Sequence, residues 1–382
     1  MIQTDYLIIG SGVAGLTFAI KIATKFPNKK ITIVTKSSED ESNTKYAQGG
    51  IAIVQNKLDD NFEKHIDDTL IAGDGLCDRE IVEIVVKEGP ARIDEIIRYG
   101  THFDKTNKGI FDLAKEGGHS ESRVLHYKDI TGFEIERALL AQIHSDPNIE
   151  ILTHYFAVEL ITQHHIGEFV DRKSDNIECY GIYALDTSTN KVERFLSRVT
   201  LMASGGAGHI YSTTTNPVIA TGDGIAMAYR AKAKVRNMEF IQFHPTALYN
   251  PGEYPSFFFS VAVRGFGGVL KTRNGEEFMQ NYDERGSLAP RDIVARAIEK
   301  KKKKSGDDFV YLDIRHREKA DILSHFPNIY AKCLSIGLDM TRDLIPVTPA
   351  AHYMCGGILV DKDGKSSIHR LYACGECTST GL

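Results

Sequence analysis

The sequence lacks the features that define several classes of protein. No apolar run reaches the roughly 20 residues that a membrane-spanning helix needs. Six cysteines scattered through 382 residues do not suit a disulfide framework. Basic residues are not in excess, because 46 lysines and arginines stand against 51 aspartates and glutamates, and a net charge of −5 argues against a nucleic-acid-binding surface. We therefore expect a cytoplasmic protein that binds neither membranes nor nucleic acids.

The first forty residues contain a β-turn-α-β pattern. The run TDYLIIG (4–10) predicts a buried parallel strand, TFAIKIATKF (17–26) a helix and ITIVTK (31–36) a second strand. Between the first strand and the helix, Gly10, Gly12 and Gly15 form a GxGxxG. Such glycines allow a tight turn, let a pyrophosphate approach the backbone and let helix and strand pack closely. We predict a dinucleotide site at this turn.

The end of the second strand bears on which dinucleotide binds. NAD-binding proteins of this type usually place an acidic residue there to hold the ribose, whereas this chain has Thr35 and Lys36. The NAD hypothesis is weakened by this difference, although an NAD-linked dehydrogenase is kept as an alternative. A flavin whose ribose is held by hydroxyl and backbone groups remains open.

The rest of the chain leaves the α/β pattern and later returns to it. Helical spacing recurs over 65–73, 79–100 (interrupted near Pro90), 130–144 and 221–233, strand-like runs cover 148–161 and 199–206, and alternation over 177–202 predicts an antiparallel hairpin. From about residue 241 the pattern is irregular, with helices at 291–301 and 317–336. Strand patterns return in GGILVD (356–361) and HRLYACGE (369–376). The predicted fold class is α/β with a second unit inserted.

Six short stretches carry a family resemblance: YAQGGIA (46–52), TGDGIAMA (221–228), FHPT (243–246), APRDIVARAI (289–298), AHYMCGG (351–357) and LYACGE (371–376). In this order, and over nearly the whole chain, they resemble the succinate dehydrogenase/fumarate reductase flavoprotein superfamily. The resemblance implies a Rossmann-like FAD-binding domain with an inserted α+β capping domain. It divides the chain into 1–240 (FAD-binding domain, first part), 241–346 (capping domain) and 347–382 (FAD-binding domain, return).

Within the superfamily, two local features resemble the L-aspartate oxidases. Succinate dehydrogenases carry a histidine, bonded covalently to FAD, where this chain has Asn43, and an amide cannot form that bond. The resemblance therefore implies non-covalent FAD. In EGGHS, Glu116 stands where succinate enzymes carry an uncharged residue. Aspartate is succinate plus an ammonium group, and burying an unpaired ammonium would cost several kcal/mol, so Glu116 is the natural discriminator.

The resemblance implies FAD-dependent oxidation of L-aspartate to iminoaspartate, with oxygen or fumarate as the electron acceptor. This is the first step of NAD biosynthesis through quinolinate, which makes quinolinate synthase a candidate partner. The catalytic candidates are Arg291, Glu116, His244 and His352, and the substrate-binding candidates add His119 and Ser260. Arg291 is a candidate acid for fumarate reduction, but arginine stays protonated at ordinary pH, so a role as clamp and electrostatic stabiliser is also open.

The resemblance and the glycine-rich turn together assign the residues that hold FAD. They lie in the turn, at the end of the second strand, around AQGG, on a strand near residue 157, in TGDG and in the late GE. These residues are Gly10, Ser11, Gly12, Ala14, Gly15, Lys36, Asn43, Thr44, Gln48, Gly49, Gly50, Ala157, Val158, Asp223 and Glu376.

The sequence departs from its relatives at several points. Relatives carry glutamates where this chain has Val261 and Phe266, and they favour glycine where it has Lys232. Family members also continue beyond STGL into a segment with a substrate-binding arginine and a helical domain, so we expect a C-terminally truncated member. Two alternatives therefore stay open: a soluble fumarate reductase or succinate dehydrogenase flavoprotein, and an inactive flavin-binding fragment.

A CxxC motif at Cys374 and Cys377 raises the question of a metal site. A structural zinc needs four ligands, and one such pair supplies two. Its middle residues are already assigned to the flavin, so we expect no metal.

Overall fold

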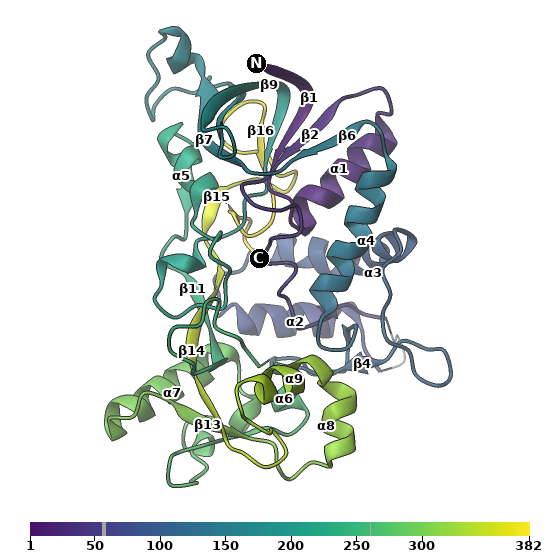
Figure 1. Cartoon of the computed structure of the whole chain (residues 1–382), viewed down its shortest axis with the longest axis vertical. Helices are drawn as coiled ribbons and strands as arrows, with labels where there is room; N and C mark the ends of the chain where they lie inside the picture. The colour runs from purple at the N-terminus through teal and green to yellow at the C-terminus, as the bar shows by residue number, and fades with distance from the viewer. Residues whose placement is uncertain (56–58, 260) are drawn as a thin grey trace.

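A seven-stranded sheet forms the upper part of the molecule (Figure 1). The computed structural model describes residues 1–55, 59–259 and 261–382. The strand order is β6 (Ile149–Leu152), β2 (Ile31–Val34), β1 (Ile2–Ile9), β9 (Lys191–Met202), β8 (Cys179–Asp186) and β7 (Tyr155–Thr162), with β16 (Leu371–Ala373) paired to β9. Strands β6, β2, β1, β9 and β16 are parallel, while β8 is antiparallel to both of its neighbours. The carboxyl ends of the parallel strands meet at one edge, where open α/β sheets bind ligands.

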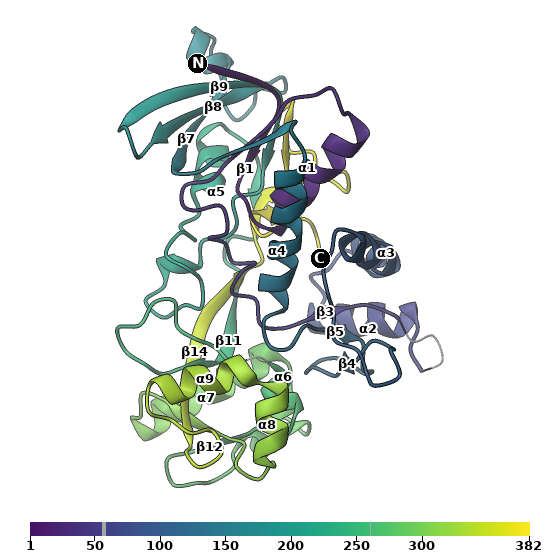
Figure 2. The ribbon, with the colours of Figure 1, turned by 45° about the vertical axis from the view of Figure 1, so that its right-hand side comes forward.

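Helices cover both faces of this sheet (Figures 1 and 2). Helices α1 (Val13–Lys25) and α4 (Thr131–Ser145) lie on one face and α5 (Asp223–Arg230) lies on the other. In β1, Ile8 packs in the core under α1 and α4, whereas Leu7 and Ile9 pack in the core that includes α5. A strand that is buried on both faces needs apolar residues at successive positions. This explains the unbroken apolar run of Leu7, Ile8 and Ile9 at the end of β1.

A second sheet with its own helices forms the lower part of the molecule (Figures 1 and 2). Its strands run in the order β11 (Ile241–Leu248), β14 (Ile345–Met354), β13 (Val310–Asp313) and β12 (Val269–Lys271), and each neighbouring pair is antiparallel. The helices are α6 (Val261–Gly265), α7 (Arg291–Ser305), α8 (Lys319–His325) and α9 (Pro327–Ser335). A separate apolar core that includes Phe278, Ile298 and Leu312 holds this part together. The two parts confirm the predicted fold class.

Strands β11 and β14 connect the two parts. In β14, Ile345 and Val347 belong to the lower core, whereas Met354 belongs to the core of the upper sheet. The strand thus crosses the domain boundary expected at 346/347, and the division into domains stays a prediction.

The remaining elements lie between and beside the two parts. Helices α2 (Phe62–Ala72) and α3 (Arg79–Arg98) lie near a small antiparallel sheet of β3 (Ile51–Ala52), β5 (Val124–Leu125) and β4 (Leu113–Ala114), as Figure 2 shows. A further sheet joins β10 (Val235–Arg236), β15 (Gly357–Leu359) and β17 (Thr378–Ser379). The loop that carries Glu116 follows β4 directly.

Two predicted elements differ from the structure. Helix α3 runs through Pro90 without the expected interruption, because Val82, Val86 and Ile93 are buried on both sides of it and their packing offsets the roughly 3 kcal/mol cost of an internal proline. The single strand expected over 148–161 is two strands, since His154 has a φ of +62° and turns the chain from β6 into β7. The hairpin predicted over 177–202 is confirmed as β8 and β9.

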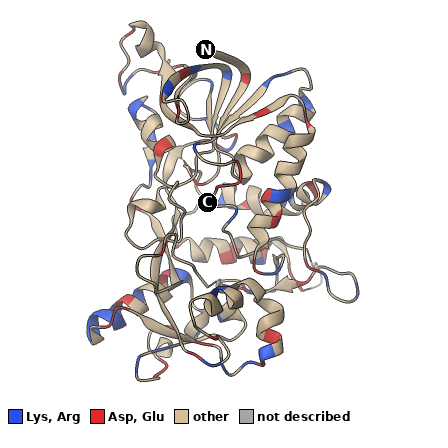
Figure 3. Cartoon of the chain, in the orientation of Figure 1, with Lys and Arg blue, Asp and Glu red and all other residues tan. Residues whose placement is uncertain are grey.

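Charged residues of both signs are spread along the whole chain (Figure 3). A basic run, Lys300–Lys304, ends α7, where positive charge suits the negative end of the helix dipole. Within the described residues, no helix combines the length and apolarity that crossing a membrane requires.

Candidate functional site

The glycine-rich turn folds as its sequence predicts. Gly10 has a φ of +112°, and a Cβ there would lie 2.2 Å from the carbonyl oxygen of Ala203. A Cβ on Gly15 would lie 2.1 Å from the carbonyl oxygen of Gly10. Both approaches exclude any larger residue. Because Gly12 is the N-cap of α1, the turn presents the helix N-terminus, whose N–H groups and dipole suit a pyrophosphate.

A cavity of about 510 Å³ lies beside this turn, at the carboxyl ends of β1, β2 and β9. Its lining includes most of the residues expected to hold the cofactor: Gly10, Ser11, Gly12, Ala14, Lys36, Asn43, Thr44, Gly49, Gly50, Ala157, Asp223 and Glu376. Gly15, Gln48 and Val158 are not in the lining. Gly15 serves the packing of α1 on β1, and the Val158 side chain is exposed. The cavity and its glycine cradle fit a dinucleotide such as FAD.

A polar cluster closes one side of the cavity. The Asn43 amide donates to Asn216 Oδ1 at 2.6 Å and to Glu376 Oε2 at 2.8 Å, and the Met354 N–H donates to Glu376 Oε1 at 2.9 Å. Burial raises the pKa of Glu376, and these donors oppose that shift. A Cβ on Gly206 would lie 2.4 Å from Glu376 Oε1, so this glycine leaves room for the carboxylate.

Sequence reasoning missed several residues of the cavity wall. Gly205 and Gly206 follow β9, and Thr215, Asn216 and Tyr353 also line the cavity. One signal was available, since a buried strand that ends in two glycines matches the pattern at the end of β1. The polar stretch TTTN (213–216) has no comparable local pattern.

An ion pair fills the place where an NAD-binding protein would have an acidic residue. Lys36, after β2, donates to Thr221 Oγ1 at 2.7 Å and forms an ion pair with Asp223. Asp223 begins α5 directly after Gly222, which has a φ of +75°. A carboxylate thus reaches the end of β2 from another element, and both charged groups line the cavity.

Two histidines from adjacent strands meet beneath the cavity. The rings of His244 on β11 and His352 on β14 have centroids 5.1 Å apart. His352 Nδ1 is 2.7 Å from Thr215 Oγ1, and His244 Nδ1 accepts the Thr246 N–H at 3.3 Å. The latter bond leaves the proton on His244 Nε2, which is buried without a partner in the described part of the chain. A buried donor of this kind suits a ligand carboxylate.

Both histidines are neutral near pH 7. Burial, then the nearby His352, Arg291 and Arg264, hold the pKa of His244 well below its usual range. Burial and Arg291 lower the pKa of His352 to about 3. Each ring can therefore donate one hydrogen bond without carrying a charge.

Arg291 and Glu116 form the charged centre of the site. Arg291 is the first residue of α7, where a cation opposes the helix dipole, and its Nη1 donates to Gln242 Oε1 at 2.8 Å. Burial raises the pKa of Glu116, while Arg291 and the Gly50 N–H act against that shift. Because Arg291 also acts on both histidines, the structure brings together the four catalytic candidates, and His352 links them to the cavity.

Arg264 on α6 is a further site residue that sequence reasoning missed. It is 1% exposed, its Nη1 donates to the Ser287 carbonyl at 2.8 Å, and Nε and Nη2 have no partner among the described residues. Burial and then Arg291 lower its pKa to about 10, while Glu116 acts in the opposite direction. It remains charged at neutral pH. Nothing local in VAVRG distinguishes it from a surface arginine.

The two other substrate-binding candidates, Ser260 and His119, stay predictions. Ser260 lies outside the described residues. The His119 ring is 5.8 Å from that of His65, and its Nδ1 is 3.4 Å from Arg123 Nη1, so it belongs to a cluster behind the loop.

The CxxC thiols are held in the protonated form. Burial raises the pKa of Cys374 to about 12 and that of Cys377 to about 11. Thiols in this state are poor metal ligands and poor nucleophiles.

Comparison with known proteins shows which class of protein has a site of this kind. A family described as "FAD binding domain" matches residues 5–382. A mutant of the E. coli quinol fumarate reductase has a similar structure, with a TM-score of 0.91 and 31% identity over 100% of this chain and 66% of that one. Together with the cavity, these similarities define an FAD-binding flavoprotein, and its cofactor is FAD.

Sequences that are more similar to this chain than the fumarate reductase identify a family within this class. "L-aspartate oxidase 2-b, chloroplastic" from Nicotiana tabacum is 49% identical over 99% of this chain and 58% of its own length. "L-aspartate oxidase 1" from Ralstonia nicotianae is 46% identical over 99% of this chain and 69% of its own length. The chain belongs to the L-aspartate oxidase family, and it spans less than two thirds of the length of the plant relatives.

Proposed function

We propose that the chain oxidises L-aspartate to iminoaspartate, with oxygen or fumarate as the electron acceptor. The observation that carries this proposal is that Glu116 lies within electrostatic range of Arg291, where a half-buried carboxylate is available to an ammonium group. The charges agree with this substrate. Two arginines, Arg291 and Arg264, face a ligand with two carboxylates, and the Glu116 carboxyl is the group that distinguishes L-aspartate, with its ammonium, from succinate.

Each side chain has a role that its geometry supports. The His244 Nε2–H and Arg291 donate to the substrate carboxylates, and Thr215 orients His352. Glu116 pairs with the ammonium and is the candidate acceptor of its proton, because the amine must be neutral before the Cα–H bond breaks. When bound, FAD supplies the two-electron acceptor for this oxidation. The final acceptor takes up two electrons and two protons, which reduces oxygen to hydrogen peroxide or fumarate to succinate. Asn43 supports non-covalent attachment of the FAD.

Arg291 is proposed as a clamp rather than as the acid that protonates fumarate. Burial lowers its pKa and Glu116 opposes that change. A guanidinium does not release its proton at ordinary pH. A fixed positive charge stabilises bound carboxylates without releasing a proton. Arg291→Leu, assayed with aspartate and with fumarate, tests this role, and a selective loss of fumarate turnover would favour the acid.

The product suggests a partner and a pathway. Iminoaspartate is an imine that water hydrolyses, so a condensing enzyme must take it up quickly. We propose quinolinate synthase for this step, on the route to NAD, and the cytoplasm as the compartment. Co-purification with quinolinate synthase and cell fractionation test these points, and the chloroplastic names of the plant relatives make the second test necessary.

Glu116→Gln is the decisive test. Anaerobic mixing of the FAD-loaded chain with L-aspartate should bleach the flavin absorbance, and the variant should need roughly 100-fold more aspartate because the ammonium loses its charged partner. Succinate should bind the variant at least as tightly as before. The control is Glu121→Gln in the same segment, where the carboxylate pairs with Lys64. If aspartate does not bleach the unmodified chain, flavin binding without turnover is favoured instead.

A further inference from the structure

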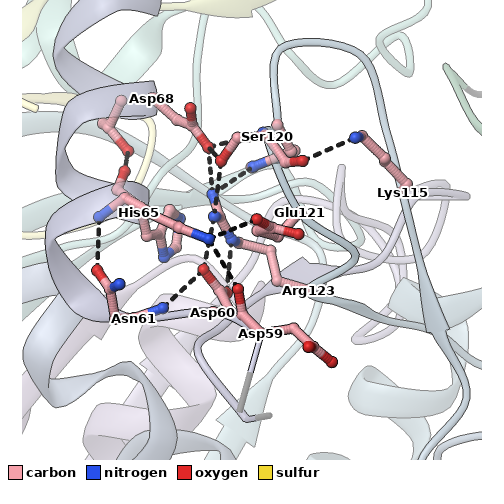
Figure 4. Close-up of polar contacts among 12 residues, drawn as sticks. Asp59, Asp60, Asn61, His65, Asp68, Lys115, Ser120, Glu121 and Arg123 are labelled. Carbon is pink, nitrogen blue, oxygen red and sulfur yellow. Dashed lines mark hydrogen bonds and ion pairs between the residues drawn. The ribbon is translucent and has the colours of Figure 1, made fainter. Parts of the chain in front are cut away.

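A buried charge cluster around Arg123 contacts the loop that carries Glu116 at Ser120 (Figure 4). Arg123, which follows the loop, is fully buried. Its Nε and Nη2 donate to the two carboxylate oxygens of Asp60 at 2.9 and 2.8 Å, and its Nη1 donates to Asp68. A bidentate pair of this kind fixes the direction of the guanidinium as well as its charge.

Asp68 connects the cluster to the loop. It lies on α2, and its Oδ2 accepts hydrogen bonds from both the N–H and the hydroxyl of Ser120, each at 2.8 Å. The same oxygen accepts from Arg123. Burial raises the pKa of Asp68, but the hydrogen bonds from Ser120 and Arg123 outweigh it and hold the pKa below its ordinary value. Asp68 therefore holds the end of the loop through one oxygen of its carboxylate group.

The loop needs an external anchor because its own backbone is flexible. Gly117 and Gly118 separate Glu116 from Ser120, and Gly118 has a φ of +91°. Glycines lose more conformational entropy on ordering than other residues do. On its other side the loop touches the lower part of the molecule, since a Cβ on Gly117 would lie 3.2 Å from the Leu288 carbonyl and 3.3 Å from Val261 Cγ1.

The net charge of the cluster does not stabilise the ionised form of Glu116, so it does not explain why the cluster lies next to the site. Arg123, Asp60 and Asp68 sum to −1, which would disfavour rather than support the ionised form of Glu116. The neighbouring imidazoles do not compensate: burial and then Arg123 lower the pKa of His65 to about 4, and the same causes lower that of His119. The contribution that remains is geometric.

We infer that Asp68 is a positioning residue for Glu116. By holding Ser120, it fixes where the Glu116 carboxylate stands relative to Arg291, and Arg123 with Asp60 keeps Asp68 in place. The preference for an amino diacid over a plain diacid then depends on a residue of α2 that does not belong to the substrate-binding group. This inference rests on the proposed function.

Asp68→Asn tests it in the FAD-loaded chain. The change keeps the volume but turns a charged acceptor into an amide that faces Arg123. We expect the apparent dissociation constant for L-aspartate, from anaerobic flavin-reduction rates, to rise about tenfold. The dissociation constants for succinate and FAD, from flavin absorbance and fluorescence titrations, should change by less than about twofold. Asp67→Asn is the matched control, because its side chain is adjacent on α2 and 64% exposed.

Ser120→Ala is the second variant, since it removes the two hydrogen bonds of the hydroxyl, to Asp68 and from Arg123 Nη2, and leaves the ion pairs of Arg123 intact. We expect a rise of about threefold in the aspartate constant, with the succinate and FAD constants unchanged. A parallel loss for aspartate and succinate, or no loss in either variant while the unmodified chain prefers aspartate, would overturn the positioning role. An unmodified chain that binds both diacids equally would instead overturn the proposed function, and with it this inference.

Discussion

Asn43 and Glu376, 333 positions apart in the chain, meet through a hydrogen bond of 2.8 Å between Nδ2 and Oε2. The bond joins the loop after β2 to the turn after β16 across the cofactor cavity. Burial raises the pKa of Glu376, and the hydrogen bonds from the Met354 N–H and Asn43 oppose that shift. Non-covalent attachment of the FAD stays a prediction, which rests on the amide of Asn43 standing where relatives carry the bonded histidine.

Asn43→Ala should weaken FAD binding without abolishing folding. The change leaves a buried carboxylate short of one donor, which costs about 1–3 kcal/mol, so the FAD dissociation constant should rise about tenfold or more. Quenching of FAD fluorescence on titration measures it, and Asn281→Ala on the lower part of the molecule is the control. Acid precipitation of the unmodified protein should leave all of the flavin in the supernatant, and flavin in the pellet would contradict non-covalent binding.

Thr215→Val should impair catalysis more than cofactor binding. Thr215 Oγ1 lies 2.7 Å from His352 Nδ1, and without that bond the ring loses both its orientation and its preferred tautomer. We expect kcat/KM for aspartate to fall about tenfold, the usual size of one well-placed hydrogen bond. Steady-state oxidation rates measure this. Thr215→Ser keeps the hydroxyl and should restore most of the activity, and a serine variant as poor as valine would argue against the bond.

The parts of the fold that rest on local pattern could be predicted from the sequence. The turn at Gly10 and the strands on either side of α1 depend on glycines and apolar runs that are contiguous in the chain. The course of α3 through Pro90 could not be predicted, since packing of residues on both sides decides it. His154 ends a strand through its φ of +62°, which no composition rule indicates.

The candidate site divides in the same way. His244, Arg291 and Glu116 stand in stretches that resemble a family, and the structure brings them together. Arg264 and Asp68 stand in no such stretch, and their roles depend on partners 20 to 60 residues away, such as Ser287 and Arg123. Contacts of this kind are set by how helices and loops dock, so they become visible only in three dimensions.

Arg264→Met should show that this arginine serves the site rather than the fold. A buried cation with two unpartnered nitrogens contributes little to stability, so the free energy of unfolding should stay within about 1 kcal/mol of the unmodified protein or increase. Arg264 also lowers the pKa of Glu116, so its removal should raise that pKa and move the acidic limb of the kcat/KM profile for aspartate to higher pH. Urea denaturation and pH profiles measure the two effects. A large loss of stability would mean that the hydrogen bond from Arg264 to the Ser287 carbonyl is important for folding.

Glu136 should make folding stability fall as the pH rises from about 5 to 8. Glu136 lies on α4 and is 2% exposed, and this burial raises its pKa from 4.5 to about 8. The hydrogen bond from Ser42, at 2.6 Å, lowers the pKa. Among the nearby charges, Asp40 and Glu41 raise the pKa and Lys45 lowers it. Below pH 4.5 the folded and unfolded states are both protonated. Above it the unfolded state releases its proton while the folded state keeps its own, so each pH unit weakens folding by up to about 1.4 kcal/mol until pH 8.

Glu136→Gln removes this titration and should flatten the pH dependence of unfolding. The difference between the two proteins should grow with pH and reach on the order of 4 kcal/mol by pH 8, in favour of the glutamine variant. Urea denaturation of the FAD-free chain at pH 5, 6, 7 and 8 measures it, with Glu150→Gln on the exposed side of β6 as the control. Ser42 Oγ donates to Glu136 and accepts the Thr44 N–H at 3.0 Å, and an ionised carboxylate accepts the Ser42 hydroxyl at least as well as the acid does, so the loop that lines the cofactor cavity should stay in place through this titration. A pH dependence of unfolding that is equal in the two proteins would remove Glu136 as the cause.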